Sequence, residues 1–326
     1  MSTGYHWFVF EWRYSILAIC VLFVALNAAL FLPTEIWTAD LASLYISTLH
    51  QLLGMLLLFL LLPMWLGCSF VISQRHTLTL AGSLDSQVPE EQKISRAVQQ
   101  FPGREIALGL GGGLLYALLF NVPPEQLELV LKGNLHALGM VLGQLLVWLC
   151  AALVLAIRLR VVSLFARLGS TIEFSVFEQR RLQPFARVGM VDIVIIVGAL
   201  AIATVQSLDA QFRLENYLSA FVLAIPGGAA LLIRPMWPLH KRLRLRKEEL
   251  LADVIQQIAQ ASEASDGAAI AHMESLLQRR DRVQSLHTWP LDVGTWSRLA
   301  FYTLIPPLAW AGAALMEAAL DRLLGL

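Results

Sequence analysis

The sequence predicts an all-α fold: a polytopic transmembrane helical bundle of about seven spans, with a cytoplasmic antiparallel helical hairpin. Three observations predict this fold. Of the 326 residues, 57% are hydrophobic and 15% are charged, whereas soluble domains have about 25% charged residues. The apolar residues are concentrated in long blocks with almost no charges, which is typical of membrane-spanning helices. Basic residues gather in every second connection between these blocks.

Seven apolar segments are each long enough for a helix to cross a hydrocarbon core of ~30 Å. In chain order they cover residues 14–33, 44–73, 105–122, 136–157, 190–208, 216–234 and 297–320. Aromatic residues precede the first segment, as at a membrane interface. That segment is also longer than the apolar region of a typical signal peptide, so we expect an uncleaved first span.

The distribution of basic residues predicts the orientation in the membrane. Connections 74–104, 158–189 and 234–298 together hold 20 of the 24 Lys and Arg. Basic connections stay on the cytoplasmic side, so we expect a multi-pass inner-membrane protein with a cytoplasmic N-terminus and an external C-terminus. The formal net charge is zero, and no nucleic-acid partner is expected.

The chain divides into three parts: a six-span region (1–235), a cytoplasmic helical hairpin (236–292) and a last, proline-kinked transmembrane helix (293–326). In the hairpin, two stretches with apolar residues at helical spacing flank the turn sequence SEASDG. Its first stretch opens with a basic cluster that either anchors the adjacent span or contacts lipid headgroups or a partner. This basic cluster consists of Lys241, Arg242, Arg244, Arg246 and Lys247.

Polar residues inside spans are the first place to look for function. His50, Gln51 and His136 fall near the outer ends of their spans. They either hydrogen-bond near the headgroups or line a cavity that binds a proton or metal, although no third ligand at metal-site spacing accompanies them. Gln144 is expected to make an interhelical hydrogen bond. Asp192, shortly after Arg187, is either a salt-bridged interfacial carboxylate or a proton-coupling acid.

Glycines and prolines mark the expected irregularities of the spans. Pro226, Gly227 and Gly228 predict a kink or break in the sixth span, and Pro306 with Pro307 predicts a kink in the seventh. Such positions are candidates for a moving or substrate-lined region. The glycine run at 109–113 lacks the Lys-Ser/Thr of a phosphate loop and instead predicts close helix packing. Cys20, Cys68 and Cys150 are expected to be buried thiols.

The C-terminal region resembles a group of uncharacterised prokaryotic multi-span membrane proteins. The matching stretches are PMWPLHKRLRLRKEEL (235–250), LLQRRDRV (276–283), WPLDVGTW (289–296) and YTLIPPLAWAGAALME (302–317). In that group, a charged helical hairpin lies between two spans, the second of which contains proline. The resemblance implies this architecture and no particular activity.

These observations favour a non-enzymatic membrane component: an accessory, scaffold or effector subunit that self-associates or docks a cytosolic partner through the hairpin. Its expected partners are the lipid bilayer and either further copies of the chain or another membrane or cytosolic protein. The alternative is a small channel or transporter that uses broken sixth and seventh spans. No catalytic constellation and no cofactor motif is recognisable in the sequence, so an intramembrane enzyme ranks third.

Overall fold

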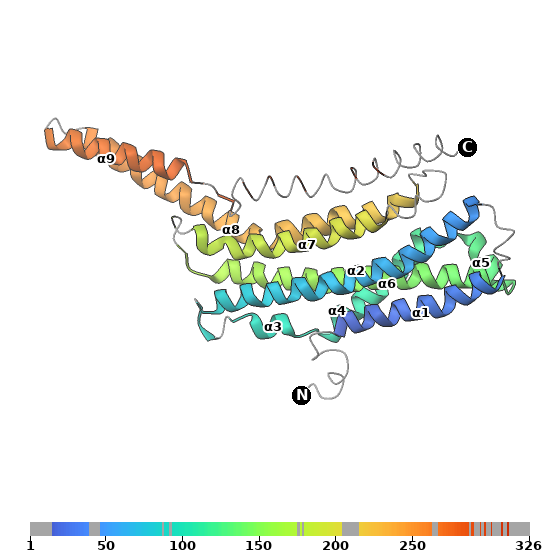
Figure 1. Cartoon of the computed structure of the whole chain (residues 1–326). Coiled ribbons are helices and arrows are strands. Elements are labelled where there is room, and N and C mark those ends of the chain that lie inside the picture. Colours follow the sequence, from blue (N-terminus) through green and yellow to red (C-terminus); the bar gives the residue numbers. More distant parts are fainter. Residues whose placement is uncertain are drawn as a thin grey trace.

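A computed structural model describes the backbone of most of the chain. The described residues are 15–38, 46–86, 88–90, 93–174, 177, 179–203, 215–262, 267–286 and 288–289, together with single positions between 294 and 312. Every long element among them is an α-helix (Figure 1). Most of the predicted seventh span, including Pro306 and Pro307, lies outside the described residues.

The helices follow one another with short connections and pack into an elongated bundle (Figure 1). In chain order they are α1 (Ser15–Thr38), α2 (Ile46–Asp85), α3 (Ser95–Gln99), α4 (Gly103–Phe120), α5 (Pro124–Leu131), α6 (Leu135–Thr171), the 3-10 turn η2 (Gln179–Leu182), α7 (Gln183–Ala203), α8 (Glu215–Ser262) and α9 (Gly267–Gln284).

Five of the described helices are long and apolar enough to cross a membrane, namely α2, α4, α6, α7 and α8. The chain is therefore a multi-pass membrane protein. Leu115, Leu119 and Phe120 on α4 are exposed, as expected for a helix that turns one side to lipid. The first predicted span corresponds to α1, whose described side chains form a shorter apolar stretch, Leu17–Ala29. The count of seven spans stays a prediction.

Several helices continue well beyond the apolar segments, which corrects the predicted loops. Helix α2 runs to Asp85 and α6 runs to Thr171, so residues 74–85 and 158–171 are helical rather than loop. Helix α7 already begins at Gln183. These extensions form a buried core of their own, which includes Leu84, Val161, Val162, Phe165, Leu168, Phe185, Leu239 and Leu243. We call this part of the bundle the basic end.

Glycines allow two helix pairs to approach closely. A Cβ on Gly113 would lie 2.8 Å from the carbonyl oxygen of Trp148, and one on Gly109 would lie 2.9 Å from the Cα of Leu153. Both glycines thus seat α4 against α6, and the prediction of close packing is confirmed for them. Gly111 and Gly112 lie on the other side of α4, where added Cβ atoms would meet nothing within 4 Å.

Of the predicted kink or break in the sixth span, the break is wrong, because α8 is one continuous helix of 48 residues that passes through Pro226; a kink there stays a prediction. Gly227 and Gly228 are buried. Cβ atoms on them would lie 3.2 Å from Leu155 and 3.3 Å from Ile193, so these glycines fit α8 against α6 and α7. Helix packing, rather than a break in the helix, therefore explains the two glycines.

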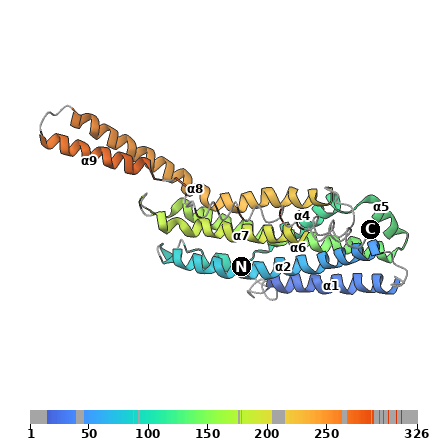
Figure 2. The same cartoon turned by 45° about the horizontal axis from the view of Figure 1, so that its top comes forward.

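Beyond the bundle, α8 continues into a projection that α9 accompanies (Figures 1 and 2). We call α9 and the part of α8 after Leu243 the arm. The end of α9 lies beside the start of the arm, because the Lys247 Nζ donates to the carbonyl oxygens of Gln284 and Leu286 at 2.6 and 2.8 Å. The two helices therefore run antiparallel. Val254, Leu276 and Val283 are buried between them.

An aromatic junction fixes the base of the arm to the bundle. The rings of His240 and Trp289 stack with centroids 4.2 Å apart, and Trp237 lies 6.4 Å from Trp289. The His240 Nδ1 also lies 3.2 Å from the carbonyl oxygen of Thr288. Trp289 thus meets the motif at 235–250, from which it is distant in sequence.

Candidate functional site: a buried ion pair beside a cavity

Arg158 on α6 is the largest fully buried side chain of the described protein, with 1% of its surface exposed. Its Nε donates to Asp192 Oδ1 on α7 at 2.6 Å. Its two terminal nitrogens donate to Gln74 Oε1 at 3.2 Å and to Thr77 Oγ1 at 3.0 Å, both on α2. One guanidinium group therefore ties three helices together.

Two further hydrogen bonds extend this network. The Ser73 hydroxyl donates to Asp192 Oδ1 at 3.1 Å. The Gln74 amide nitrogen donates to the carbonyl oxygen of Val98 on α3 at 2.7 Å. We call Ser73, Gln74, Thr77, Arg158 and Asp192 the Arg158 cluster. It joins α2, α3, α6 and α7.

The cluster lies where the apolar segments of its helices meet the basic end, directly after the predicted span 136–157 and inside the predicted span 190–208. A charge in such a place is costly unless it is paired and hydrogen-bonded. Arg158 and Asp192 neutralise each other, and Gln74 and Thr77 accept two further hydrogen bonds from the guanidinium. The pair can therefore be kept in a buried position.

One carboxylate oxygen of the pair remains unused. Asp192 is completely buried, and its Oδ2 makes no hydrogen bond with any residue that the structure describes. Buried polar atoms are normally paired, so this carboxylate oxygen is an exception within the cluster.

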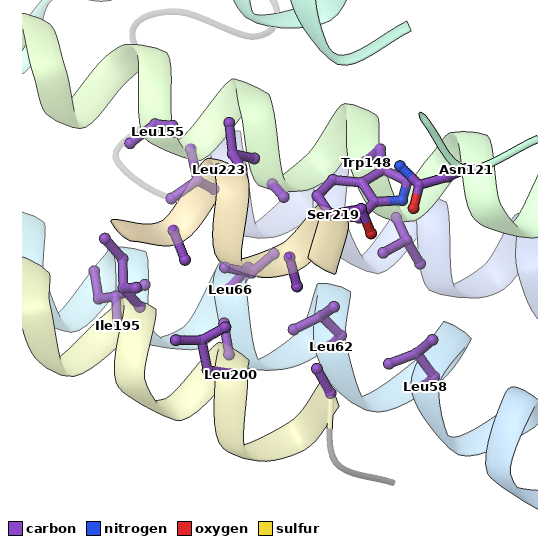
Figure 3. Close-up of a pocket in the computed structure, with 18 of the residues that line it drawn as sticks. Leu58, Leu62, Leu66, Asn121, Trp148, Leu155, Ile195, Leu200, Ser219 and Leu223 are labelled. Carbon is purple, nitrogen blue, oxygen red and sulfur yellow. The ribbon is translucent and has the colours of Figure 1, made fainter. Parts of the chain in front are cut away.

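This oxygen belongs to a residue in the wall of a cavity of ≈ 150 Å³ between α2, α6, α7 and α8. Leucines and alanines form most of the wall (Figure 3). Leu62 and Leu66 of α2 and Leu200 of α7 lie on the same side, and Leu223 of α8 lies opposite them (Figure 3). The cavity is thus predominantly apolar.

Polar groups mark the two ends of the cavity. Arg158 and Asp192 lie at one end, and Asn121, Gln144 and Ser219 lie towards the other. Gln144 precedes Arg158 by 14 residues on α6, which corresponds to ~21 Å along a helix. Gln144 Oε1 is buried and, within the described part of the chain, accepts no hydrogen bond. The residues that line the cavity therefore extend along α6 from Gln144 to Arg158.

Of the predicted polar residues, the structure brings Gln144 and Asp192 to this one cavity. Asp192, expected to be either a salt-bridged interfacial carboxylate or a proton-coupling acid, is buried and pairs with Arg158, whereas the preceding Arg187 donates to Gln183 at 3.2 Å. The side chains of His50, Gln51 and His136 lie outside the described residues. The expected interhelical hydrogen bond of Gln144 does not involve its Oε1 within the described chain.

The predicted basic cluster separates into two kinds of residue. Arg242 donates to the carbonyl oxygens of Gly169 and Ile172 at 3.1 and 2.7 Å, at the carboxyl end of α6. Lys247 does the same at the end of α9. Both side chains act as helix C-caps and are engaged within the protein. The exposed remainder of the predicted cluster is Lys241, Arg244 and Arg246.

Sequence reasoning placed Arg158 in a basic loop and missed Ser73, Gln74 and Thr77. A signal was present, because Arg158 continues the spacing of the buried residues Val161, Val162 and Phe165 on α6. Ser73, Gln74 and Thr77 likewise continue the series Phe70, Ala81 and Leu84 on α2. A polar residue at a core position of a helix needs a hydrogen-bond partner, so the spacing marks each of these residues as unusual.

The cysteines also differ in part from expectation. Cys20 and Cys150 are buried, with their sulfur atoms 3.2 Å apart between α1 and α6. Cys68 was expected to be buried but is exposed on α2, on a helix that turns part of its surface to lipid.

No protein-family model, curated protein or solved structure matches this chain. The resemblance of the C-terminal motifs to multi-span membrane proteins stays a prediction. Function is therefore inferred from the geometry described above.

Proposed function

We propose that the chain is a non-enzymatic component of the inner membrane, an accessory, scaffold or effector subunit whose arm self-associates or docks a cytosolic partner. The observation that carries this proposal is the continuity of α8, which runs from the bundle into the arm as a single helix of 48 residues. A continuous helix transmits position and force between its two ends, so an event at the arm can reach the bundle.

The base of the arm supports this role. Lys247 joins the start of the arm to the end of α9, and the aromatic junction of Trp237, His240 and Trp289 lies just below. These contacts hold the arm at a defined place on the bundle. Beyond them, Leu245 and Ile255 on α8 are 51% and 54% exposed, which leaves apolar surface for a partner or a second copy.

The distribution of charge supports a cytoplasmic arm. The three basic connections, which hold 20 of the 24 Lys and Arg, belong to helix ends that share the core of the basic end. Under the positive-inside rule this end faces the cytoplasm. The N-terminus then lies inside and, with seven spans, the C-terminus lies outside.

The contact between Lys247 and Gln284 allows the arm to be removed cleanly. We would replace residues 249–283 with a short Gly-Ser linker, because the two flanking positions are already adjacent. A control variant carries an unrelated antiparallel helical pair of the same length. We expect both variants to insert and to fold, and both to lose the oligomer or the co-purifying partner seen with the intact chain in native mass spectrometry. Unchanged assembly in the linker variant would contradict the proposal.

A channel or transporter is the second candidate, and the cavity with its buried ion pair is the observation that favours it. Because α8 is continuous, a break in the sixth span no longer supports the channel or transporter. Ion flux or substrate uptake in liposomes tests this candidate. A flux that is the same in the intact chain and in Asp192→Asn and His136→Ala variants would count against a pathway lined by these residues.

A further inference from the structure

A shallow groove between α6 and α8 lies where the sixth predicted span meets the base of the arm. It has a volume of ≈ 410 Å³, and the residues that line it include Ala166 of α6 and Ala229, Ala230, Ile233, Arg234 and Trp237 of α8. The groove is open rather than enclosed, and Ile233 and Trp237 are 41% and 56% exposed. A molecule in this groove is therefore in direct contact with the surrounding bilayer.

The groove changes character along α8. Ala229, Ala230 and Ile233 lie inside the predicted span 216–234, and Arg234 is the last residue of that span. The two alanines leave room beside α6 for an apolar chain. Trp237 follows Arg234 by about one turn, and tryptophan is enriched where hydrocarbon meets the headgroups. The groove thus leads from the hydrocarbon core to the headgroup region.

Positive charge gathers at the headgroup end of the groove. Arg234 and Lys241 are both exposed. They are seven residues apart and so lie on one face of α8, with Trp237 between them. Neither α6 nor residues 216–247 of α8 include an acidic residue. The two helices that form the groove therefore supply no negative counter-charge to these side chains.

These features together restrict the occupant of the groove. It needs an apolar chain for the alanine-lined part and a negative group for Arg234 and Lys241, joined at the depth of Trp237. A phospholipid whose headgroup carries a net negative charge has this arrangement. A zwitterionic phospholipid also brings an ammonium group, which opposes the attraction to the two basic side chains, and a soluble phosphate has no chain to bury.

We propose that this groove binds an anionic phospholipid. The phosphate lies between Arg234 and Lys241, the glycerol backbone lies beside Trp237, and one acyl chain runs along Ala229 and Ile233. The chain needs only to lie along the open groove, because its other side stays in contact with the bilayer. This site does not depend on the function proposed for the arm.

Brominated phospholipids test the place of binding, because bromine quenches nearby tryptophan fluorescence. The full chain is placed in phosphatidylcholine nanodiscs that contain increasing fractions of phosphatidylglycerol with bromine on one acyl chain. A matched series contains phosphatidylcholine with the same brominated chain. The difference between the intact chain and a Trp237→Phe variant isolates the signal of Trp237 from those of the other eight tryptophans.

We expect the quenching of Trp237 to saturate at a low fraction of brominated phosphatidylglycerol. With brominated phosphatidylcholine it should rise only in proportion to the fraction of that lipid. Identical curves for the two lipids, or an absence of saturable quenching, would overturn the proposal.

Charge variants test the headgroup contact. Arg234→Gln and Lys241→Gln should each weaken the binding of phosphatidylglycerol about fivefold, the size expected for one basic residue at an anionic membrane surface. The double variant Arg244→Gln/Arg246→Gln is the control. It removes two charges from the same helix that are already paired with Glu248 and Glu249, and it should leave the binding unchanged. A larger loss in this control than in Arg234→Gln would contradict the assignment.

Two alanine variants test the path of the acyl chain. Ala229→Leu narrows the groove, and Ala252→Leu adds the same side chain in the arm. Both positions are exposed, so both variants should fold. We expect the first to abolish the saturable quenching and the second to preserve it. Equal quenching in the two variants would exclude the groove as the place of binding.

Glycerol phosphate distinguishes a lipid from a soluble phosphate, because it has the anionic group without the acyl chains. An excess of glycerol phosphate should leave the quenching by brominated phosphatidylglycerol unchanged. Recovery of the Trp237 fluorescence would instead show that the groove binds a soluble phosphate, and the assignment to a phospholipid would be wrong.

Discussion

The bundle and the arm both contain pairs of arginine and carboxylate, but in opposite surroundings. Arg158 and Asp192 come from different helices, are 1% and 0% exposed, and meet at 2.6 Å. Arg244–Glu248 and Arg246–Glu249 are neighbours on the surface of α8, with more than half of each side chain exposed, and meet at 2.9 Å. The distances are similar, so distance alone does not distinguish the pairs.

Solvent decides what each pair contributes. In the arm, water and salt screen the charges, and either residue can be lost with little consequence. In the bundle, each charge depends on the other, because the loss of one leaves an uncompensated charge in an apolar place. The same kind of ion pair thus contributes little to stability in the arm, whereas in the bundle it restricts how the helices can be arranged.

The largest expected effect follows from separating the buried pair. Asp192→Ala or Arg158→Ala should lower the free energy of unfolding by ~3–5 kcal/mol, because the remaining charge stays buried without its partner. Denaturant titration of the detergent-solubilised protein, followed by circular dichroism, measures this change. The double variant Arg158→Leu/Asp192→Leu is the control and should be more stable than either single variant. If the single variants unfolded at the same denaturant concentration as the unmodified chain, the buried pair would not constrain the arrangement of the helices.

A smaller loss of stability is expected when an uncharged residue in the packed interior of the bundle is changed. Gly113→Ala should destabilise the protein by ~1–3 kcal/mol, because the new Cβ would lie 2.8 Å from the Trp148 carbonyl oxygen and push α4 away from α6. Gly112→Ala is the matched control, with no atom within 4 Å of the new Cβ. It should be neutral or stabilising by up to ~1 kcal/mol through helix propensity. Thermal unfolding of the two variants compares them directly, and equal melting temperatures would contradict the packing described.

The smallest effects concern the basic cluster at the start of the arm. Arg242→Gln should cost ~1–2 kcal/mol, because the side chain donates to two carbonyl oxygens at the end of α6. Arg244→Gln should cost at most ~0.5 kcal/mol, because its partner Glu248 is exposed. Unfolding measurements at low and high salt separate the two, since only the exposed pair is strongly screened. A larger loss for Arg244→Gln than for Arg242→Gln would reverse the assignment of roles within the cluster.

Much of the fold follows from the sequence. The apolar segments predicted the centres of α2, α4, α6, α7 and α8, because the hydrocarbon core demands about 20 apolar residues from each crossing helix. The ends of the helices were harder to predict from the sequence. Past the hydrocarbon core, α2, α6 and α8 continue with mixed composition; α2 and α6 stay helical against the core of the basic end, and the last part of α8 stays helical against α9. In the same way, Pro226 suggested a break that packing against α6 and α7 does not require.

For the candidate site, the sequence determined which residues were unusual, and the tertiary structure determined which of them meet. Gln144 and Asp192 were recognisable because polar residues inside spans are costly wherever they lie. Arg158 was hidden by its position at the end of an apolar segment, where basic residues normally face water. Its pairing with Asp192, its contacts to α2 and the cavity beside it depend on how four helices pack, and residue spacing along a single helix carries no information about the neighbour across the interface.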